Sequence, residues 1–126
     1  MGEQENRALA ERVWRGTNEG DFPAVLDEVL AEECVQEWPQ SRERIRGKAN
    51  IIAINKNYPG LPTSTVRNIR ACERLVVTEV ELDYGGRPYH CVSIFEIENG
   101  KVVHETDYFA EPFEAPQWRA QWVERY

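Results

Sequence analysis

The spacing of hydrophobic residues changes once along the chain, near residue 60. Before that point, apolar residues recur every three or four positions, which is the repeat of an α-helix with one buried side. This pattern predicts helices over residues 5–18, Phe22–Leu30 and Lys48–Asn57. Gly20 is suited to end the first helix, because glycine tolerates a left-handed backbone. Asp21 is suited to cap the second, because its carboxylate accepts hydrogen bonds from free N–H groups.

The segment between the second and third helices is less regular. Cys34–Trp38 alternates loosely and stops at Pro39, which has no backbone N–H to donate, so we expect a short edge strand here. The polar run Pro39–Gly47 that follows predicts a loop.

Beyond residue 60 the period becomes two, with apolar and polar residues alternating as in a strand that buries one face. The pairs Gly85-Gly86 and Asn99-Gly100 are typical of hairpin turns. The predicted strands cover Thr63–Cys72, Leu75–Tyr84, Pro88–Glu98 and Lys101 to about Glu111. Because short turns join neighbouring strands, the sequence predicts a four-stranded antiparallel meander.

Helices that precede a run of strands indicate an α+β domain in which the helices cover one face of the sheet. The length of 126 residues suits one domain, so we expect a single domain over residues 1–126. Residues 112–126 form an aromatic C-terminal tail, with Trp118, Trp122 and Tyr126 at the spacing of a helix face. Three interpretations of the tail stay open: a terminal helix docked on the domain, a lid over a cavity, or a dimer contact.

The formal net charge of −7 argues against nucleic acid or an anionic membrane as a partner, because an acidic surface attracts neither. No apolar run reaches the ~20 residues that a membrane span needs, and the N-terminal residues contain no apolar signal-peptide core. Cys34, Cys72 and Cys91 are odd in number and widely spaced, unlike a disulfide framework or a zinc site. These features predict a cytoplasmic protein with reduced thiols.

The last predicted strand carries the most informative chemistry. Strict alternation places Val103, Glu105, Asp107 and Phe109 on one face. Two carboxyl groups two residues apart under apolar neighbours repel each other and are poorly solvated, and both effects raise a carboxyl pKa. A carboxyl group tuned in this way can remove a proton from a carbon next to a carbonyl.

Two stretches of the sequence carry a family resemblance: Glu37–Gly47 (EWPQSRERIRG) and Glu98–Arg119 (ENGKVVHETDYFAEPFEAPQWR). With the order of the elements, they resemble the nuclear-transport-factor-2-like superfamily and, within it, the SnoaL-like proteins related to ketosteroid isomerase and polyketide cyclases. The resemblance implies a cone-shaped fold, in which a curved antiparallel sheet has three N-terminal helices packed on its concave face. It also implies that Asp107, in the D-Y-F segment, is the acid/base residue.

The same resemblance implies further properties of the protein. It implies a homodimer whose contact is the outer face of the sheet, at His104, Thr106 and Tyr108, with the tail as a further contribution. It also implies chemistry that needs no cofactor, acting on a small hydrophobic molecule.

Two well-defined chemistries of the superfamily lack their residues in this chain. The epoxide hydrolases need an arginine and a carboxylate on the strand before the first hairpin, where this chain has Val80 and Leu82. The base of ketosteroid isomerase stands before a proline, and here Trp38 holds that place, with Glu37 expected to face the other way. We therefore do not expect epoxide hydrolysis or steroid isomerisation by those mechanisms.

Several aromatic side chains and one carboxylate are expected to line a ligand cavity beside Asp107: Trp14, Trp38, Tyr58, Glu105 and Phe109. A cavity with aromatic walls and a few polar groups is typical of a small-molecule site. Ordinary core packing is the alternative for each aromatic residue, and a solvent-facing position is the alternative for Glu105. For Asp107 the alternative is a structural hydrogen bond to the backbone or to a Tyr or Trp side chain.

Two classes of function follow. The first is a cofactor-independent isomerase, cyclase or hydratase that uses Asp107 for proton transfer. The second is a protein that binds a hydrophobic ligand without turning it over, or a dimeric accessory protein. No metal is expected, because His104 and Asp107 point to opposite faces of their strand, and His90 and Cys91 diverge likewise.

Overall fold

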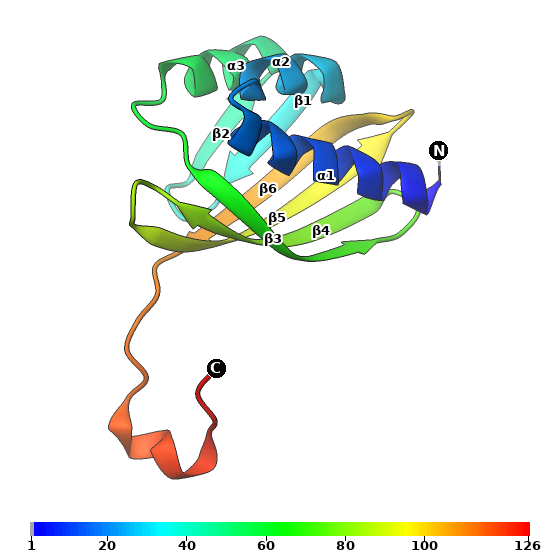
Figure 1. The fold of residues 1–126 in the computed structure, drawn as a ribbon. Coiled ribbons are helices and arrows are strands. Elements are labelled where there is room, and N and C mark those ends of the chain that lie inside the picture. The colour runs from blue at the N-terminus through cyan, green and yellow to red at the C-terminus, as the bar shows by residue number, and fades with distance from the viewer. Residues whose placement is uncertain (1) are drawn as a thin grey trace.

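The chain folds as a curved sheet with three helices on one side, as a computed structural model that describes residues 2–126 shows (Figure 1). This is the predicted α+β class, and the three helices lie where the sequence predicts them. The elements are α1 (Glu3–Glu19), α2 (Phe22–Val29), β1 (Leu30–Trp38), β2 (Glu43–Arg46), α3 (Lys48–Asn57), β3 (Thr63–Ala71), β4 (Leu75–Asp83), β5 (Pro88–Glu98), β6 (Lys101–Ala110) and the 3₁₀ helix η1 (Gln117–Trp122).

The sheet has six strands in the order β2-β1-β6-β5-β4-β3. Strands β3 to β6 form the predicted antiparallel meander. The prediction of an edge strand over Cys34–Trp38 is wrong, because β1 lies inside the sheet and pairs in parallel with β6. The prediction of a loop over Pro39–Gly47 is wrong in part, because Glu43–Arg46 forms the edge strand β2. Only Ile45 is buried in β2, so the sequence of this strand has little apolar periodicity.

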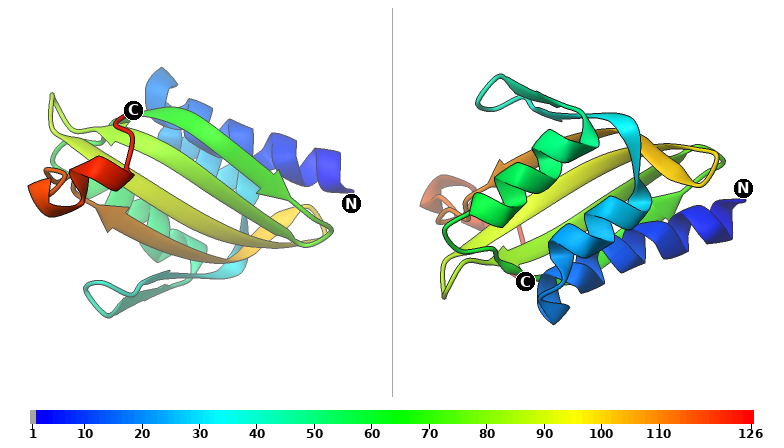
Figure 2. Two further views of the ribbon diagram at one scale, coloured as in Figure 1. Left: turned by 90° about the horizontal axis from the view of Figure 1, so that it is seen from below. Right: turned by 90° about the horizontal axis from the view of Figure 1, so that it is seen from above.

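The three helices cover the concave face of the sheet (Figure 2). Helix α1 contacts β3 and β4, whereas α3 contacts β1 and β2. Gly20 ends α1 with a φ of 81°, as its position in the sequence predicts. The core between helices and sheet includes Ala10 and Leu26 from the helices and Val76 and Phe95 from the sheet, all buried.

Strand β6 contains one residue more than its partner β5. Val102 pairs with Ile97 and His104 pairs with Glu96, so Val103 has no partner of its own in this ladder. A bulge of this kind interrupts the strict alternation of faces. Val102, rather than the predicted Val103, is therefore the buried residue. The carboxylates that follow the bulge lie in the interior with it.

The C-terminal arm (residues 112–126) leaves the sheet at the end of β6 and extends from the side opposite the helices (Figures 1 and 2). Its regular element is the 3₁₀ helix η1, and no residue of η1 is buried. The interpretation of the tail as a docked terminal helix is therefore wrong. Pro116, just before η1, has an extended backbone, with φ −69° and ψ 143°.

Candidate functional site

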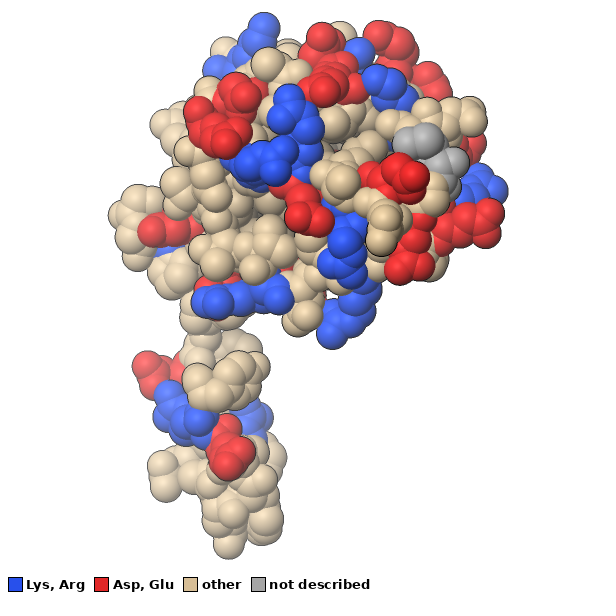
Figure 3. Space-filling view, turned by 45° about the vertical axis from the view of Figure 1, so that its right-hand side comes forward, with Lys and Arg blue, Asp and Glu red and all other residues tan. Residues whose placement is uncertain are grey.

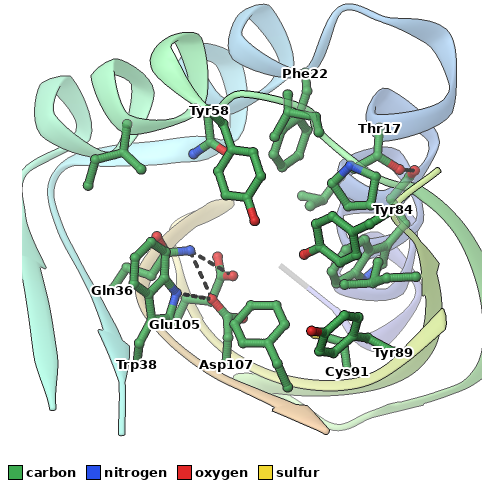
Figure 4. A pocket seen from close by; sticks show the side chains of 18 of the residues that line it. Thr17, Phe22, Gln36, Trp38, Tyr58, Tyr84, Tyr89, Cys91, Glu105 and Asp107 are labelled. Atoms are coloured by element: carbon green, nitrogen blue, oxygen red, sulfur yellow. Dashed lines mark hydrogen bonds between the residues drawn. The ribbon is translucent and has the colours of Figure 1, made fainter. Parts of the chain in front are cut away.

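A cavity of about 490 Å³ lies between the concave face of the sheet and the helices. This size falls within the range of small-molecule sites in proteins. Its walls come from all three helices and from β1, β4, β5 and β6. Gln36, Glu105 and Asp107 meet on one wall of the cavity (Figure 4). Phe22, Leu26, Ile54 and Leu82 are among the apolar residues that line it.

The structure brings all six residues proposed from the sequence to this cavity: Trp14, Trp38, Tyr58, Glu105, Asp107 and Phe109. Asp107 is 4% exposed and Glu105 is 7% exposed, so the alternative of a solvent-facing Glu105 is wrong. Trp14 lines the cavity and packs in the core at once, because its Nε1 donates to Thr78 Oγ1 at 3.0 Å.

Asp107 accepts hydrogen bonds from three side chains. Ser93 Oγ donates to Oδ1 at 2.6 Å, and the Oδ2 atom accepts from Trp38 Nε1 and Gln36 Nε2, each at 3.1 Å. The bond from Trp38 agrees with the alternative in which Asp107 makes a structural hydrogen bond to a Tyr or Trp side chain. No backbone N–H of residues 2–126 donates to this carboxylate. These donors fix the direction of the carboxylate and favour its charged form.

Glu105 is held more loosely than Asp107. Gln36 Nε2 donates to Glu105 Oε2 at 3.0 Å, and it is the one donor that reaches this carboxyl within residues 2–126. Gln36 thereby bridges both acids, yet its own Oε1 is buried and has no hydrogen-bond partner within the described chain. An unpaired buried acceptor costs about 1–3 kcal/mol.

The two carboxyl groups share a raised affinity for protons. Burial raises the pKa of Glu105 well above its ordinary value, and the charge of Asp107 raises it further. Burial also raises the pKa of Asp107, but its contact with Glu105 and the hydrogen bonds from Ser93, Trp38 and Gln36 oppose that rise. Because the neighbours favour a charged Asp107, the proton that the pair retains lies on Glu105.

Tyrosine hydroxyls face the carboxyl pair from the other side of the cavity. The hydroxyl groups of Tyr58 and Tyr84 point into the cavity (Figure 4). Burial raises the pKa of Tyr84, so this hydroxyl stays neutral and can donate a hydrogen bond. The rings of Tyr84 and Tyr89 pack edge to face, with centroids 5.3 Å apart. Sequence reasoning had selected only Tyr58 of these three residues.

Two polar residues of the site, Gln36 and Ser93, were also missed. Gln36 stands two positions before Trp38 on one strand, so the period of two could have placed both on one face. Ser93 pairs with Asp107 across β5 and β6. Without the bulge in β6, the hairpin register would instead pair Ser93 with Thr106, so the turn sequence alone could not have found this contact.

Three residues at positions that the resemblance singled out, Glu37, Val80 and Leu82, lie as the sequence predicts. Glu37 points away from the cavity, where its carboxylate contacts His104 Nε2 and Arg44 Nη2, each at 2.7 Å. Val80 and Leu82 are buried, and Leu82 is part of the cavity wall. The cavity is therefore apolar at the strand where the epoxide hydrolase pattern carries its charges.

The thiol of Cys91 is less suited to catalysis than the carboxyl pair. Cys91 lines the cavity, but burial raises its pKa to about 12, so its thiol stays protonated and is a poor nucleophile.

Residues 2–126 contain no group of three or more His, Cys, Asp or Glu side chains arranged to hold a metal ion. In the same residues, no helix is both long and apolar enough to cross a membrane.

Comparison with known proteins identifies relatives over the whole chain. A crystal structure of an "NTF-2 like protein of unknown function" from Burkholderia xenovorans LB400 is 43% identical, covers 100% of this chain and 98% of its own, and has a TM-score of 0.92. A crystal structure from Kribbella flavida DSM 17836, described as a "putative ketosteroid isomerase", is 32% identical, covers 98% of this chain and 91% of its own, and has a TM-score of 0.84.

More distant structures show the fold alone. An LEH-like epoxide hydrolase from M. tuberculosis is 21% identical, covers 85% of this chain and 84% of its own, and has a TM-score of 0.73. No curated protein matches the chain. The family model described as "SnoaL-like domain" matches residues 10–105. With this match over most of the chain and the fold of its structural relatives, the chain belongs to the SnoaL-like domain family and has the nuclear-transport-factor-2-like fold.

Proposed function

We propose that the protein transfers protons on a small hydrophobic carbonyl compound without a cofactor, and that Glu105 and Asp107 are its acid and base. The observation that carries this proposal is a buried carboxyl pair in contact with an apolar cavity. Burial raises the pKa of both groups, toward the range in which acid–base catalysis is efficient near neutral pH.

The two carboxyl groups divide the reaction between them. The charged Asp107 takes a proton from the carbon next to the carbonyl, while the protonated Glu105 gives its proton to the carbonyl oxygen. The product is an enol, and the pair is left with a protonated Asp107 and a charged Glu105. If the substrate has a C=C bond next to the carbon that loses the proton, the enol is a dienol. Protonation of the dienol by Asp107 at the far end of that C=C bond, with return of the enol proton to Glu105, completes an isomerisation. Sequence reasoning assigned the acid/base role to Asp107 alone, whereas the hydrogen bonds support a role for the pair.

The cavity also suggests what the substrate carries besides its carbonyl. The apolar walls favour a hydrophobic body. The hydroxyl groups of Tyr58 and Tyr84 can donate to an oxygen atom on the far side of that body.

Binding without turnover is a second candidate, and one observation favours it. Both oxygen atoms of Asp107 already accept hydrogen bonds from side chains. A base whose lone pairs are occupied must exchange one of these bonds for the substrate proton. In this second case the carboxyl pair serves only to orient a polar group of the ligand.

An exchange experiment separates the two candidates. Small cyclic ketones of increasing size are incubated with the protein in D₂O, and NMR follows the loss of the proton next to the carbonyl. Asp107→Asn keeps the shape of the side chain, since its amide oxygen can accept from Trp38 and Gln36 while its NH₂ donates to Ser93. Proton transfer by a positioned base contributes roughly 10²–10⁴-fold, so we expect Asp107→Asn to slow exchange by at least about 100-fold.

Further variants control this experiment. Glu105→Gln should also slow the exchange, because a glutamine cannot give a proton to the carbonyl oxygen. Glu79→Gln, on a solvent-exposed ion pair away from the cavity, should leave the rate unchanged. Ketones that change the tryptophan fluorescence of the protein but exchange no faster than in buffer would support binding without turnover.

We also propose that the protein works in the cytoplasm. Its three cysteines are free, and Cys72 is exposed. Free exposed thiols persist in reducing compartments. This chemistry supports the location but identifies no partner.

A further inference from the structure

The cavity carries charges of opposite sign in its buried and its exposed parts. Glu105 and Asp107 are buried in its wall. Among the described residues that line the cavity, Arg87 alone is basic, and it is exposed. Tyr58 and Leu61 also line the cavity and are 40% and 36% exposed. We call these three exposed residues the mouth of the cavity, so the positive charge lies at the mouth and the acids lie inside.

The hairpin between β4 and β5 holds the backbone of Arg87. Tyr84 N donates to Arg87 O at 2.9 Å, and Arg87 N donates to Tyr84 O at 3.4 Å. Gly85 and Gly86 form the turn between them, with positive φ values of 64° and 95°. A two-residue turn of this kind matches the twist of the strands that it joins. A tight hairpin therefore sets the position of Arg87.

The guanidinium of Arg87 keeps donors that a ligand can use. Within residues 2–126 it donates one hydrogen bond, from Nη2 to Tyr89 OH at 3.3 Å. Its Nη2 lies 3.9 Å from Glu111 Oε1, which is too far for a hydrogen bond. Tyr89 OH donates to that same oxygen at 2.9 Å. Because a guanidinium has five N–H donors, Arg87 can bind a planar anion through two of them and keep its contact with Tyr89.

Three tyrosine rings of the cavity wall contact one another in a row that ends at Arg87. The ring centroids of Tyr58 and Tyr84 are 6.2 Å apart, and those of Tyr84 and Tyr89 are 5.3 Å apart. The Cζ atom of Arg87 lies 5.9 Å from the centroid of the Tyr89 ring. All three tyrosines line the cavity. They offer an apolar surface for the body of a ligand whose charged end lies at Arg87.

The spacing along the chain limits which ligands can reach both charged parts of the cavity. Ser93 pairs with Asp107, and Arg87 stands about six residues before Ser93. An extended chain of that length spans ~20 Å, of which the long arginine side chain covers a part. A ligand that contacts both Arg87 and the acids must therefore carry its anionic group well away from its carbonyl.

The charges also favour one orientation of such a ligand. The charged Asp107 repels an anionic group, whereas Arg87 attracts it. The net charge of −7 opposes the approach of any anion. In Figure 3, however, acidic and basic side chains are interspersed over the visible face of the domain, so the acids are not gathered in one patch there. The local charge of Arg87 can therefore direct the anionic end to the mouth and the carbonyl end to the acids.

We propose that the molecule bound in the cavity is a keto acid, with its carbonyl beside Glu105 and Asp107 and its carboxylate on the guanidinium of Arg87. A single guanidinium with Glu111 nearby suits a planar anion of one charge better than a phosphate of two charges, which Glu111 would repel more strongly. The inference rests on the proposed function, because it concerns the same ligand in the same cavity. Arg87 selects and orients this ligand and takes no part in proton transfer.

Binding of two matched ketones tests the proposal. One is a cyclohexanone that carries a para-carboxyphenyl group on the ring carbon opposite its carbonyl, and the other is the amide of this acid. Tryptophan fluorescence gives their dissociation constants, since Trp14 and Trp38 line the cavity. The wild type should prefer the acid, and Arg87→Gln should reduce this preference by at least about fivefold. Arg87→Lys should retain part of it, because the charge remains but the two-pronged contact is lost.

Two further variants sharpen the measurement. Glu111→Gln should increase the preference for the acid, because it removes the negative charge beside Arg87 while its amide oxygen can still accept from Tyr89. Arg74→Gln is the matched control. The side chain of Arg74 is 69% exposed, compared with 73% for Arg87, and it pairs with Glu98 outside the cavity. This variant should leave the preference unchanged.

Proton exchange of the same two ketones in D₂O separates this proposal from the proposed function. Equal affinity for acid and amide, tighter binding of the amide, or a preference that survives Arg87→Gln would overturn the keto acid, even if both ketones exchange. A preference that depends on Arg87, without exchange faster than in buffer, would support the carboxylate site and contradict proton transfer. A preference that depends on Arg87, together with exchange that Asp107→Asn slows, would support both.

Discussion

Strands β1 and β6 carry carboxyl groups on both sides of the sheet, and the surroundings on the two sides shift the pKa values of these groups in opposite directions. On the inner side, burial raises the pKa of Glu105 and Asp107. On the outer side, hydrogen bonds from Arg44 and His104 lower the pKa of Glu37. Glu37 is the direct sequence neighbour of Gln36, which contacts both inner acids.

The comparison shows that the surroundings, not the residue type, decide what a carboxyl group can do. An acid beside an arginine in solvent stays charged at every pH near neutrality and so cannot give up a proton. An acid in an apolar cavity retains its proton longer and can exchange it with a ligand. The carboxyl pair on the inner side is therefore suited to acid–base chemistry, whereas Glu37 on the outer side is not.

The largest expected effect comes from removing a donor on the inner side. Ser93→Ala deletes the 2.6 Å hydrogen bond to Asp107. A hydrogen bond to a buried charge is worth about 1.5–3 kcal/mol, so we expect the free energy of unfolding to fall by about 2 kcal/mol at pH 8. The loss should shrink in acid, where Asp107 is protonated. Thermal unfolding monitored by circular dichroism at several pH values measures this.

Ser41→Ala is the matched control for that measurement. Ser41 Oγ also donates to a carboxylate at 2.6 Å, that of Glu43, but both residues are exposed. Its loss should change the unfolding free energy by less than about 0.5 kcal/mol. Equal losses in Ser93→Ala and Ser41→Ala would contradict the contrast between the inner and outer carboxylates.

An effect of opposite sign is expected for Glu105→Gln. An acid whose pKa is raised in the folded state binds more protons in the folded chain than in the unfolded chain. The wild type therefore loses stability as the pH rises from 4.5, the ordinary pKa of a glutamate, through the raised pKa of Glu105. The glutamine removes this penalty while its amide can still contact Gln36 and Asp107. We expect a melting temperature at pH 8 that is about 4 °C higher for each unit by which the pKa is raised.

The pH dependence is the decisive part of that experiment. Near pH 4 the wild type and Glu105→Gln should melt at similar temperatures, because Glu105 is then protonated in both the folded and the unfolded chain. A difference that is constant from pH 4 to pH 8 would mean that the protonation of Glu105 does not limit stability.

The smallest effect is expected on the outer side. Arg67 lowers the pKa of Glu81, so this acid contributes stability above the unfolded pKa that is lost as pH falls through the folded value. Both side chains are exposed, and solvent screens such a pair strongly. Glu81→Gln should therefore leave the melting temperature at pH 7 within the scatter of repeated scans, with or without added salt. A shift as large as that of Ser93→Ala would show that the two sides differ less than proposed.

Alternation along single strands predicted a substantial part of the site. The period of two placed Glu105, Asp107 and Phe109 on one face of β6, and the structure has all three at the cavity. The same alternation predicted that Glu37 points to the face opposite Trp38, and in the structure Trp38 lines the cavity while Glu37 pairs with Arg44 outside it. These predictions need only the direction of a side chain relative to its neighbours in sequence, which local backbone geometry sets.

Local patterns along the chain predicted the type of most elements and the face that each buries, whereas the surroundings of Asp107 depend on contacts between distant segments. The parallel pairing of β1 with β6 brings Gln36 and Trp38 to Asp107 across about 70 residues of chain. The bulge at Val103 sets the register that places Ser93 opposite the same carboxylate. A periodic pattern reports which side of a strand is buried, but it does not report which strand lies beside it, because that choice depends on packing across the whole domain.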